Sequence, residues 1–381
     1  MSETMRVHTI TKATGPDGAR YDCIVETPGE TRHLYFEVVS SAGPHTLAKN
    51  DDWIVLSLLM LAMKAGQTLE IESRVSPLLL HAARGDIQHL LRRLDPGLSL
   101  VEVKADVSHE RLARQGNLRV GTGFSAGIDS FAALGSFAET GLSSDLEITD
   151  VFTFNVGALG GGLGANVRNA FRLIFDRALE FAALTGSTAH GVNSNLHLFY
   201  TGVPGMDFQR THTMRNMAAA SIFQSEIDCY LYASTFGYGD LDLTATYDLA
   251  HFDPLLLPLL APEGMRFLSA NAGIDRVEKT RLTAGNPIAK QLLDVCVAPT
   301  AARAEAIRNR RNCSRCWKCA RTMITLDGLG HLDEFARVFD LDHYRAHTES
   351  IVELVRRKGR KGSSLDQAAY DCYIAAWPGQ H

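Results

Sequence analysis

Residues 121–131 bring small residues, two hydroxyls and a carboxylate to the point where a strand pattern changes into a helical one. They read Gly-Thr-Gly-Phe-Ser-Ala-Gly-Ile-Asp-Ser-Phe. Apolar residues with strand spacing precede them, and apolar residues with helical spacing follow. A strand that turns on small residues into a helix points several backbone N–H groups at one spot, which favours an anion there. The segment therefore predicts an α/β fold with a phosphate-type site at this turn.

Within this turn, residues 125–130 (the 125–130 loop) carry the groups suited to that chemistry. Ser125 and Ser130 can hydrogen-bond to phosphate oxygens, and Asp129 can cap the helix or lie near Mg²⁺. The Walker sequence Gly-Lys-[Ser/Thr] is missing, so this is not that nucleotide motif. A strand–helix turn without a ligand is the alternative interpretation.

Composition places the chain among ordinary globular proteins. Its 381 residues, 45% apolar and 21% charged, suggest two to three domains. The net charge of -5 gives no overall case for a nucleic-acid or membrane partner. The first residues show no basic segment followed by an apolar run, and the longest apolar stretch, residues 53–63, is too short for a bilayer. We therefore expect a cytoplasmic protein.

Hydrophobic spacing predicts a mostly parallel sheet flanked by helices, preceded by a smaller α+β domain. We expect an N-terminal α+β domain over residues 1–112, a nucleotide-binding domain over 113–330 and a C-terminal helical segment over 331–381. The expected strands are residues 6–11, 21–26, 33–39, 68–72, 98–104, 148–155, 188–193, 228–234 and 266–270. The expected helices are residues 52–63, 77–94, 167–184 and 212–226.

Four of the seven cysteines have the spacing of a metal site. Cys313, Cys316 and Cys319 are separated by two residues each, and Cys296 lies seventeen positions upstream. Four thiolates complete a tetrahedron around zinc, which makes a closed, structural site. An iron–sulfur cluster is the main alternative, because ferredoxin-like sequences share the spacing; three free thiols are another. The odd number of cysteines argues against a disulfide framework.

The 125–130 loop resembles the Ser-Gly-Gly-x-Asp-Ser loop of the PP-loop ATP pyrophosphatases. Together with the downstream cysteines, it is similar to 7-cyano-7-deazaguanine synthase and its relatives over roughly residues 118–325. Two further fragments, Val203-Pro204-Gly205 and Arg215-Asn216, resemble parts of that family's Val-Pro-Gly-Arg-Asn segment. The resemblance implies an adenine nucleotide alpha hydrolase-like (HUP-like) fold, ATP with Mg²⁺, and a structural Zn²⁺ in a four-cysteine knuckle beside the active site.

The chain departs from the family pattern at several places, including Val297 where the family has Tyr and a longer gap between Cys296 and the other three cysteines. Ala126 replaces the usual Gly, and a Cβ there restricts the backbone. Residues 293–295 read Leu-Asp-Val where the family has Thr-Trp-Ser, and the N-terminal domain has no counterpart in the standalone synthase. The resemblance therefore bears on ATP chemistry more than on a nitrile product.

The resemblance and the residue types together assign expected roles. Asp129, Arg215 and Lys279 are expected in catalysis, with the two cations stabilising charge that develops on phosphate. His212, Asn216 and Arg276 are expected to contact the substrate, and Cys296, Cys313, Cys316 and Cys319 to bind the metal. The expected nucleotide-binding residues are Phe124, Ser125, Ala126, Gly127, Ile128, Asp129, Ser130 and Asn155.

These roles describe a ligase that adenylates a carboxylate of a deazaguanine-like substrate, releases pyrophosphate and forms an amide or nitrile with ammonia or an amine. A peptide or protein acceptor recognised by the N-terminal domain, and a homodimer, are compatible with the sequence. The alternatives are a PP-loop tRNA sulfurtransferase and a non-catalytic nucleotide-binding scaffold. Basic runs at residues 303–321 and 356–361 fit solvated surface better than nucleic-acid contacts.

Overall fold

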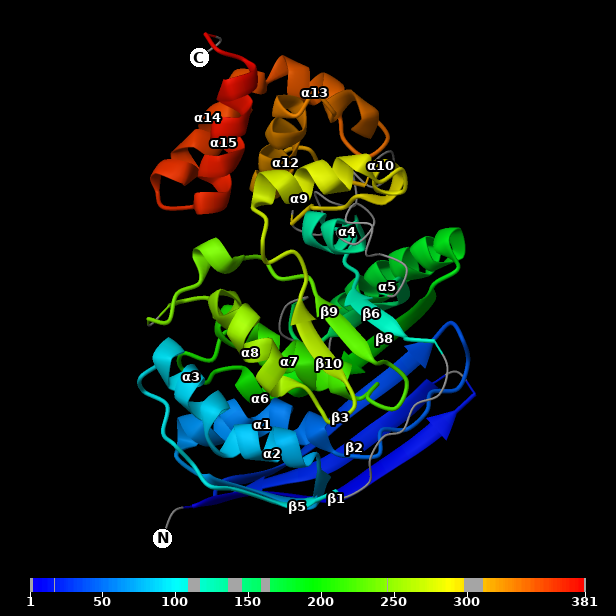
Figure 1. Ribbon diagram of the computed structural model, residues 1–381, viewed down its shortest axis with the longest axis vertical. Coiled ribbons are helices and arrows are strands. Elements are labelled where there is room, and N and C mark those ends of the chain that lie inside the picture. Colours follow the sequence, from blue (N-terminus) through cyan, green and yellow to red (C-terminus); the bar gives the residue numbers. More distant parts are fainter. Residues whose placement is uncertain are drawn as a thin grey trace. The chain divides into compact units, whose positions relative to one another are not determined.

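The computed structural model describes residues 3–16, 18–108, 117–135, 146–158, 165–244, 246–297 and 311–379 (Figure 1). The chain forms two compact units, each built from two stretches of sequence. The first comprises Met1–Gly123 and Ser144–Ala272, and the second comprises Phe124–Ser143 and Gly273–His381. In the described part of the chain, no helix combines the length and apolar character needed to cross a bilayer.

A ten-stranded, mostly parallel sheet forms the centre of the first unit. Its strand order is β10-β9-β6-β7-β8-β3-β2-β1-β4-β5. Neighbours are parallel except in the three pairs β8–β3, β3–β2 and β2–β1. The strands are β1 (Thr4–Gly15), β2 (Gly18–Thr27), β3 (Glu30–Ser40), β4 (Thr68–Val75), β5 (Val103–Val107), β6 (Val120–Gly123), β7 (Ile148–Asn155), β8 (Thr188–Ser194), β9 (Cys229–Tyr232) and β10 (Arg266–Ser269).

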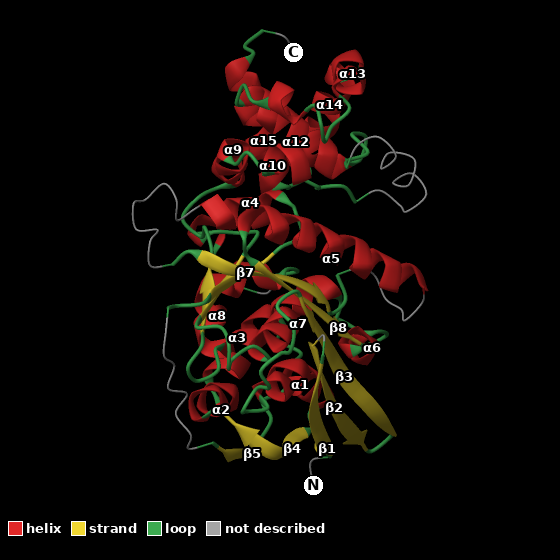
Figure 2. Ribbon diagram, turned by 90° about the vertical axis from the view of Figure 1, so that its right-hand side faces the viewer, coloured by secondary structure: helices red, strands yellow, loops and turns green. Residues whose placement is uncertain are grey.

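Helices pack on both faces of this sheet. Helix α5 (Ala165–Thr185) lies along β7 and β8 (Figure 2). On the opposite face, Phe152 of β7 packs against Phe223, just beyond α7 (Phe208–Ser221), which in turn packs against α1 (Asp52–Ala65). The other helices of the unit are α2 (Pro77–Arg84), α3 (Asp86–Leu94), α6 (Leu196–Tyr200), α8 (Asp253–Leu260) and the short η1 (Tyr238–Asp240) and η2 (Leu249–Phe252).

The predicted α/β class with a mostly parallel, helix-flanked sheet is confirmed. The bounds of β7 match the strand expected over residues 148–155, five of whose eight residues are buried. The two compact units do not divide the chain at residues 112 and 330. Strand β3 pairs with β8, so β1, β2 and β3 belong to the same sheet as the later strands. The division into 1–112, 113–330 and 331–381 stays a prediction about domains.

Three expected elements differ from the structure for local reasons. The helix expected over 77–94 is two helices, because Gly85 has non-helical dihedrals (φ -141, ψ -93). The strand expected from residue 98 begins at Val103, because the Gln88 amide takes both backbone groups of Val101. Helix α7 begins earlier than expected, because Asp207 caps it by accepting from the backbone N–H of Arg210.

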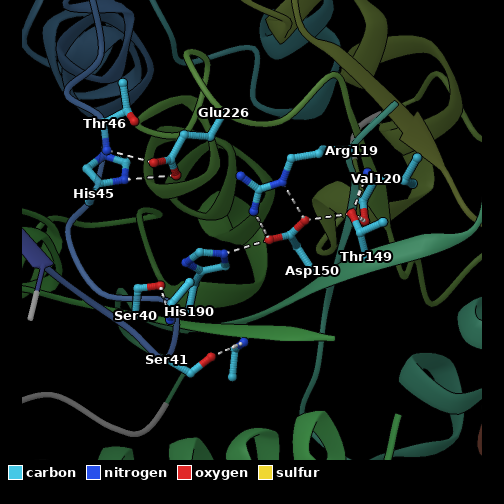
Figure 3. A network of polar contacts seen from close by, with 12 residues as sticks. Ser40, Ser41, His45, Thr46, Arg119, Val120, Thr149, Asp150, His190 and Glu226 are labelled. Carbon is cyan, nitrogen blue, oxygen red and sulfur yellow. Dashed lines mark hydrogen bonds and ion pairs between the residues drawn. The ribbon is translucent and has the colours of Figure 1, made fainter. Parts of the chain in front are cut away.

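Polar contacts fasten the N-terminal strands to the parallel part of the sheet (Figure 3). Beyond β3, the Ser41 backbone N–H donates to the Ala189 carbonyl, and the Ala189 N–H donates to Ser41 Oγ, both at 2.9 Å. Further on, His45 Nδ1 lies 3.1 Å from Glu226 Oε2, and the Thr46 N–H donates to Glu226 Oε1 at 2.6 Å. The bonds to Glu226 join segments of the first unit that lie about 180 positions apart in sequence.

A second polar cluster lies within the parallel strands. The Asp150 carboxylate, fully buried on β7, accepts from His190 Nε2 at 2.8 Å and from the guanidinium of Arg119. Burial raises the pKa of Asp150, but the bonds from His190, Arg119 and Thr149 outweigh it, so the pKa lies below its usual value. The paired charge satisfies a carboxylate that would otherwise be costly to bury.

The second unit is helical. It contains α4 (Ile128–Gly135), α9 (Arg276–Gly285), α10 (Ala289–Leu292), α12 (Trp317–Gly328), η3 (Leu332–Phe335), α13 (Leu341–Ala346), α14 (Thr348–Arg360) and α15 (Ser364–Ala376). Helices α4 and α9 pack together, as do α12, α14 and α15 (Figure 1). Arg321 of α12 makes a bidentate, buried ion pair with Asp366 of α15, at 2.9 and 3.1 Å. This pair ties α12 to α15.

The Glu226 contacts predict an acid-dependent loss of stability. Burial raises the pKa of Glu226, but the bonds from His45 and Thr46 lower it more, to about 2. A carboxyl with a depressed pKa stabilises the folded state above its ordinary pKa of 4.5, and the stabilisation is lost as the pH falls towards 2. Glu226→Gln should therefore cost on the order of 3 kcal/mol at pH 6 and flatten the loss between pH 4.5 and 2.

Urea unfolding of the wild type and Glu226→Gln at a series of pH values measures this difference. Glu349→Gln, at an exposed position of α14, serves as the matched control. Equal acid slopes for the wild type and Glu226→Gln would rule out the stabilising role of this carboxylate.

Candidate metal centre and anion-binding loop

The four expected metal ligands converge in the second unit. Their sulfur atoms all lie within 4.8 Å of one another, with Cys313 Sγ 3.8 Å and Cys316 Sγ 3.4 Å from Cys319 Sγ. Zinc with bonds of about 2.3 Å to a tetrahedron of sulfurs places the sulfurs about 3.8 Å apart, so the cluster fits such an ion. The four cysteines can therefore hold a metal ion such as zinc.

A tight knuckle shapes this cluster. The backbone N–H groups of Arg315 and Cys316 donate to Cys313 Sγ at 3.4 and 3.2 Å. Ser314 adopts a left-handed conformation (φ 58), which turns the chain so that both N–H groups face the sulfur. Helix α12 begins directly after Cys316 and carries Cys319 in its first turn. The knuckle thus supplies two ligands before the helix and one from within it.

The crowded sulfurs compete for protons. The pKa of the Cys313 thiol is lowered to about 6, and the hydrogen bond from Cys319 is the largest cause. Hydrogen bonds to Cys296, Cys313 and Cys316 raise the pKa of the Cys319 thiol far above its usual range. A bound dication would hold all four sulfurs as thiolates, because metal ligation requires the deprotonated form.

The 125–130 loop also lies in the second unit and leads into α4. Ser130 Oγ accepts from the Ser125 backbone N–H at 3.0 Å and lies 3.1 Å from Ser125 Oγ. Ala126 is fully buried and left-handed (φ 59), a conformation that costs an L-residue roughly 1–2 kcal/mol. The expected glycine-like backbone is thus present although the residue is alanine. The first N–H groups of α4 have no acceptors within the helix, as at any helix start.

Three residues with expected roles come together at this loop. Arg276 donates to Asp129 Oδ1 at 3.0 Å, and Lys279 Nζ lies 3.9 Å from the same oxygen. Both cations lie one turn apart on α9, whose N-cap Asp275 accepts from the Glu278 backbone N–H. The Lys279 side chain is 2% exposed, so its charge lies almost out of contact with water. Their catalytic and substrate-binding roles stay predictions.

Two further cations lie near Asp129 and Arg276, and the sequence did not predict them as site residues. Lys318 and Arg321 of α12 interact electrostatically with both Asp129 and Arg276. Arg321 is already paired with Asp366, whereas Lys318 has no ion pair within 4.0 Å in the described chain. Burial together with the nearby cations Arg276 and Arg321 holds the pKa of Lys318 below its usual value, despite the opposing effect of Asp129.

The basic runs at residues 303–321 and 356–361 each place a cation against the Trp317 ring. Trp317 is 37% exposed, and the charged groups of Arg321 and Lys358 lie 4.9 and 4.7 Å from its ring centre. Such cation–π contacts occupy these cations without any nucleic acid. The first run falls partly on residues 298–310, which lie outside the described residues.

The other residues with expected roles lie in the first unit. Asn155, at the end of β7, donates to Asn193 Oδ1 of β8 at 2.7 Å, and Asn193 donates to Glu37 of β3 at 3.2 Å. The Asn155 Oδ1 atom is buried, with no hydrogen-bond partner in the part of the chain that the structure describes. Asn155 therefore has one unused acceptor, and its contact with a nucleotide stays a prediction.

Arg215 is a buried cation that makes no ion pair with a carboxylate among the described residues. It donates to the carbonyls of Met206 at 3.1 Å and Val156 at 3.4 Å, and its guanidinium lies 4.0 Å from the Tyr200 ring centre. Burial lowers its pKa, although the guanidinium stays protonated at neutral pH. Among the described residues, this buried charge is held by carbonyls and by the rings of Tyr200 and Phe208, and it can accept an anion.

His212 and Asn216 meet at one hydroxyl that the sequence did not identify. Tyr232 OH lies 2.9 Å from His212 Nδ1 and accepts from Asn216 at 3.0 Å. His212 Nε2 lies 3.0 Å from Asp248 Oδ1. Arg215 lies between them in sequence but has different partners, the Met206 and Val156 carbonyls and the Tyr200 ring. Neither Tyr232, at the end of β9, nor Asp248, before η2, belongs to a motif, so only the fold brings them to α7.

The predicted residues therefore fall into two sets. The second unit holds the 125–130 loop, Arg276, Lys279 and the four cysteines, whereas the first unit holds Asn155, His212, Arg215 and Asn216. No protein-family model matches the chain. Searches of curated proteins and of solved structures likewise find no significant match.

The cysteine geometry predicts one tightly held zinc ion per chain in a colourless protein. Cys316→Ser should leave less than half of the zinc after dialysis against a chelator, because three thiolates hold the ion far more weakly than four. Elemental analysis of the purified protein measures the metal. The half-buried Cys372→Ser is the matched control and should retain it. A brown protein with iron and visible absorbance would contradict zinc.

Proposed function

We propose that this chain is an ATP-dependent ligase of the PP-loop pyrophosphatase type with a HUP-like fold. One arrangement carries the proposal: the 125–130 loop at the start of α4, with Arg276 and Lys279 directed at its Asp129. The cysteine cluster in the same unit supports it, because the resembling family combines both features. Function resides in the site and not in the fold, so the proposal rests on the residues of this loop and the cations beside it.

The charges around the loop suit a polyanion. Asp129 carries one negative charge. The three positive charges of Arg276, Lys279 and Lys318 all interact with it. The hydroxyls of Ser125 and Ser130 and the N-terminal dipole of α4 add favourable interactions with phosphate oxygens. Pyrophosphate would therefore meet net positive charge and oriented donors, which stabilise it as it leaves.

The proposed reaction has two steps. A carboxylate oxygen of the substrate attacks the α-phosphorus of ATP, the bond to the β-phosphate breaks, and pyrophosphate leaves into the loop. Ammonia or an amine then attacks the acyl adenylate, so that a C–N bond forms and AMP departs. A second activation, with loss of the remaining oxygen, would turn the amide into a nitrile. Positioning and electrostatics carry the acceleration, because AMP is a good leaving group.

Each cofactor has residues that would hold it. The 125–130 loop would bind ATP, and Asp129 would hold Mg²⁺, which neutralises phosphate charge when bound. Asp129 is paired with Arg276 in this structure, so it would exchange that partner for the ion. Zinc at the four cysteines would be structural. The proposed acceptor is a deazapurine-like carboxylate, and the proposed location is the cytoplasm.

Nucleotide products test the proposal directly. With labelled ATP, a deazapurine carboxylate and ammonia, the wild type should form AMP and pyrophosphate. Ser130→Ala should lower the rate by about 100-fold, because it removes a hydroxyl that in the proposed reaction would donate to the leaving pyrophosphate. Ser350→Ala on α14 is the matched control and should be unaffected. Formation of ADP and phosphate would overturn the proposal, absence of any nucleotide product from the wild type would favour a non-catalytic scaffold, and full activity of Asp129→Ala would exclude a catalytic role for that carboxylate.

A further inference from the structure

We infer that Asp294 is a positioning residue through which the four-cysteine metal centre holds the 125–130 loop in its anion-binding shape. Asp294 makes one bond to each site. Its backbone N–H donates to the Ala126 carbonyl at 2.7 Å, and its carboxylate Oδ1 accepts from the Cys296 backbone N–H at 3.0 Å. The inference rests on the proposed phosphate-binding role of this loop.

The loop needs such support at Ala126. An alanine in the left-handed region is strained by roughly 1–2 kcal/mol, so the surroundings must hold it there. The bond from Asp294 fixes the direction of the Ala126 carbonyl, and Asp294 O lies near the position that a Cβ on Gly127 would take, at 3.9 Å. The segment before Cys296 therefore packs against the turn at Ala126 and Gly127.

The segment 293–296 is in turn held from the metal side. Asn312, which precedes Cys313, accepts from the Val295 N–H at 2.8 Å and donates to the Leu293 carbonyl at 2.9 Å. Asn312 is 1% exposed, so these bonds are shielded from water. A metal ion bound by the four cysteines would tie Cys296 to Cys313 as well. Metal ligation and the Asn312 bonds thus fix one short segment, whose Asp294 contacts the loop.

This chain of contacts gives the metal a role at a distance from its ligands. Without the ion, the segment 293–296 keeps the Asn312 bonds but loses the tie from Cys296 to the knuckle, so it is less restrained. The Ala126 peptide then loses part of its support, and the loop populates other conformations. An anion that binds only the ordered loop would then show a weaker apparent affinity. Its apparent dissociation constant would be the intrinsic constant divided by the fraction of molecules in which the loop is ordered.

Hydrogen exchange read by mass spectrometry tests the coupling in the full chain. In zinc-loaded Asp294→Ala, amides of residues 124–131 should exchange about 3–10-fold faster than in the wild type, the loss expected for one hydrogen bond. Asp294→Asn keeps an acceptor for the Cys296 N–H and should restore wild-type exchange. Amides of α14 and α15 should not change, and the exposed Asp333→Ala is the matched control.

Two further arms make every outcome decisive. If Asp294→Ala loses its zinc, wild-type protein is compared before and after chelation, and faster loop exchange in the zinc-free form is expected. Unchanged loop exchange in either zinc-loaded Asp294→Ala or zinc-free wild-type protein would overturn the inference. Calorimetric titration of the wild type with pyrophosphate tests the proposed function separately. No binding there would refute the phosphate role, whereas the exchange data alone decide the coupling.

Discussion

The convergence of four cysteine sulfurs is the constraint on which the second unit depends. Cys296 and the knuckle at 313–319 are separated in sequence, and their sulfurs nevertheless lie within 4.8 Å of one another. Closing this cluster places the segment 293–296 beside the 125–130 loop and starts α12 at Trp317. The helix then carries Lys318 and Arg321 to the electrostatic surroundings of Asp129. A structural metal would thereby shape an anion site without touching the anion.

The 125–130 loop combines strain with support. Ala126 occupies a backbone region in which glycine is the usual choice, and a bond from outside the loop holds it there. Around it, the carboxylate of Asp129 is balanced by Arg276 and Lys279, so the site keeps positive charge for a ligand. The first unit holds a separate buried cation, Arg215, with no carboxylate in ion-pair contact in the described chain. Both features suit binding of phosphate groups, although they arise from different elements.

Sequence patterns predicted the parts of this structure that depend on local spacing. The alternation of strands and helices, the bounds of β7 and the meeting of four cysteines all follow from periodicity or ligand spacing. The joining of β3 to β8 could not be predicted, because strand pairing across about 150 residues leaves no local pattern. Asp294 was missed for a similar reason. Its contact with the loop is made by the backbone N–H, which every residue except proline has, and the acceptor at Ala126 lies far away in sequence. Tyr232 and Asp248 likewise become visible only when the fold brings them to His212.

The central claim is that the 125–130 loop is the phosphate-binding element, and NMR of the backbone amides during titration with pyrophosphate tests it most directly. The largest shift changes should fall on residues 125–130 and the first turn of α4, with smaller changes at Arg276 and Lys279 on α9. Changes confined to the basic run at residues 356–361, with the loop amides unmoved, would contradict the account.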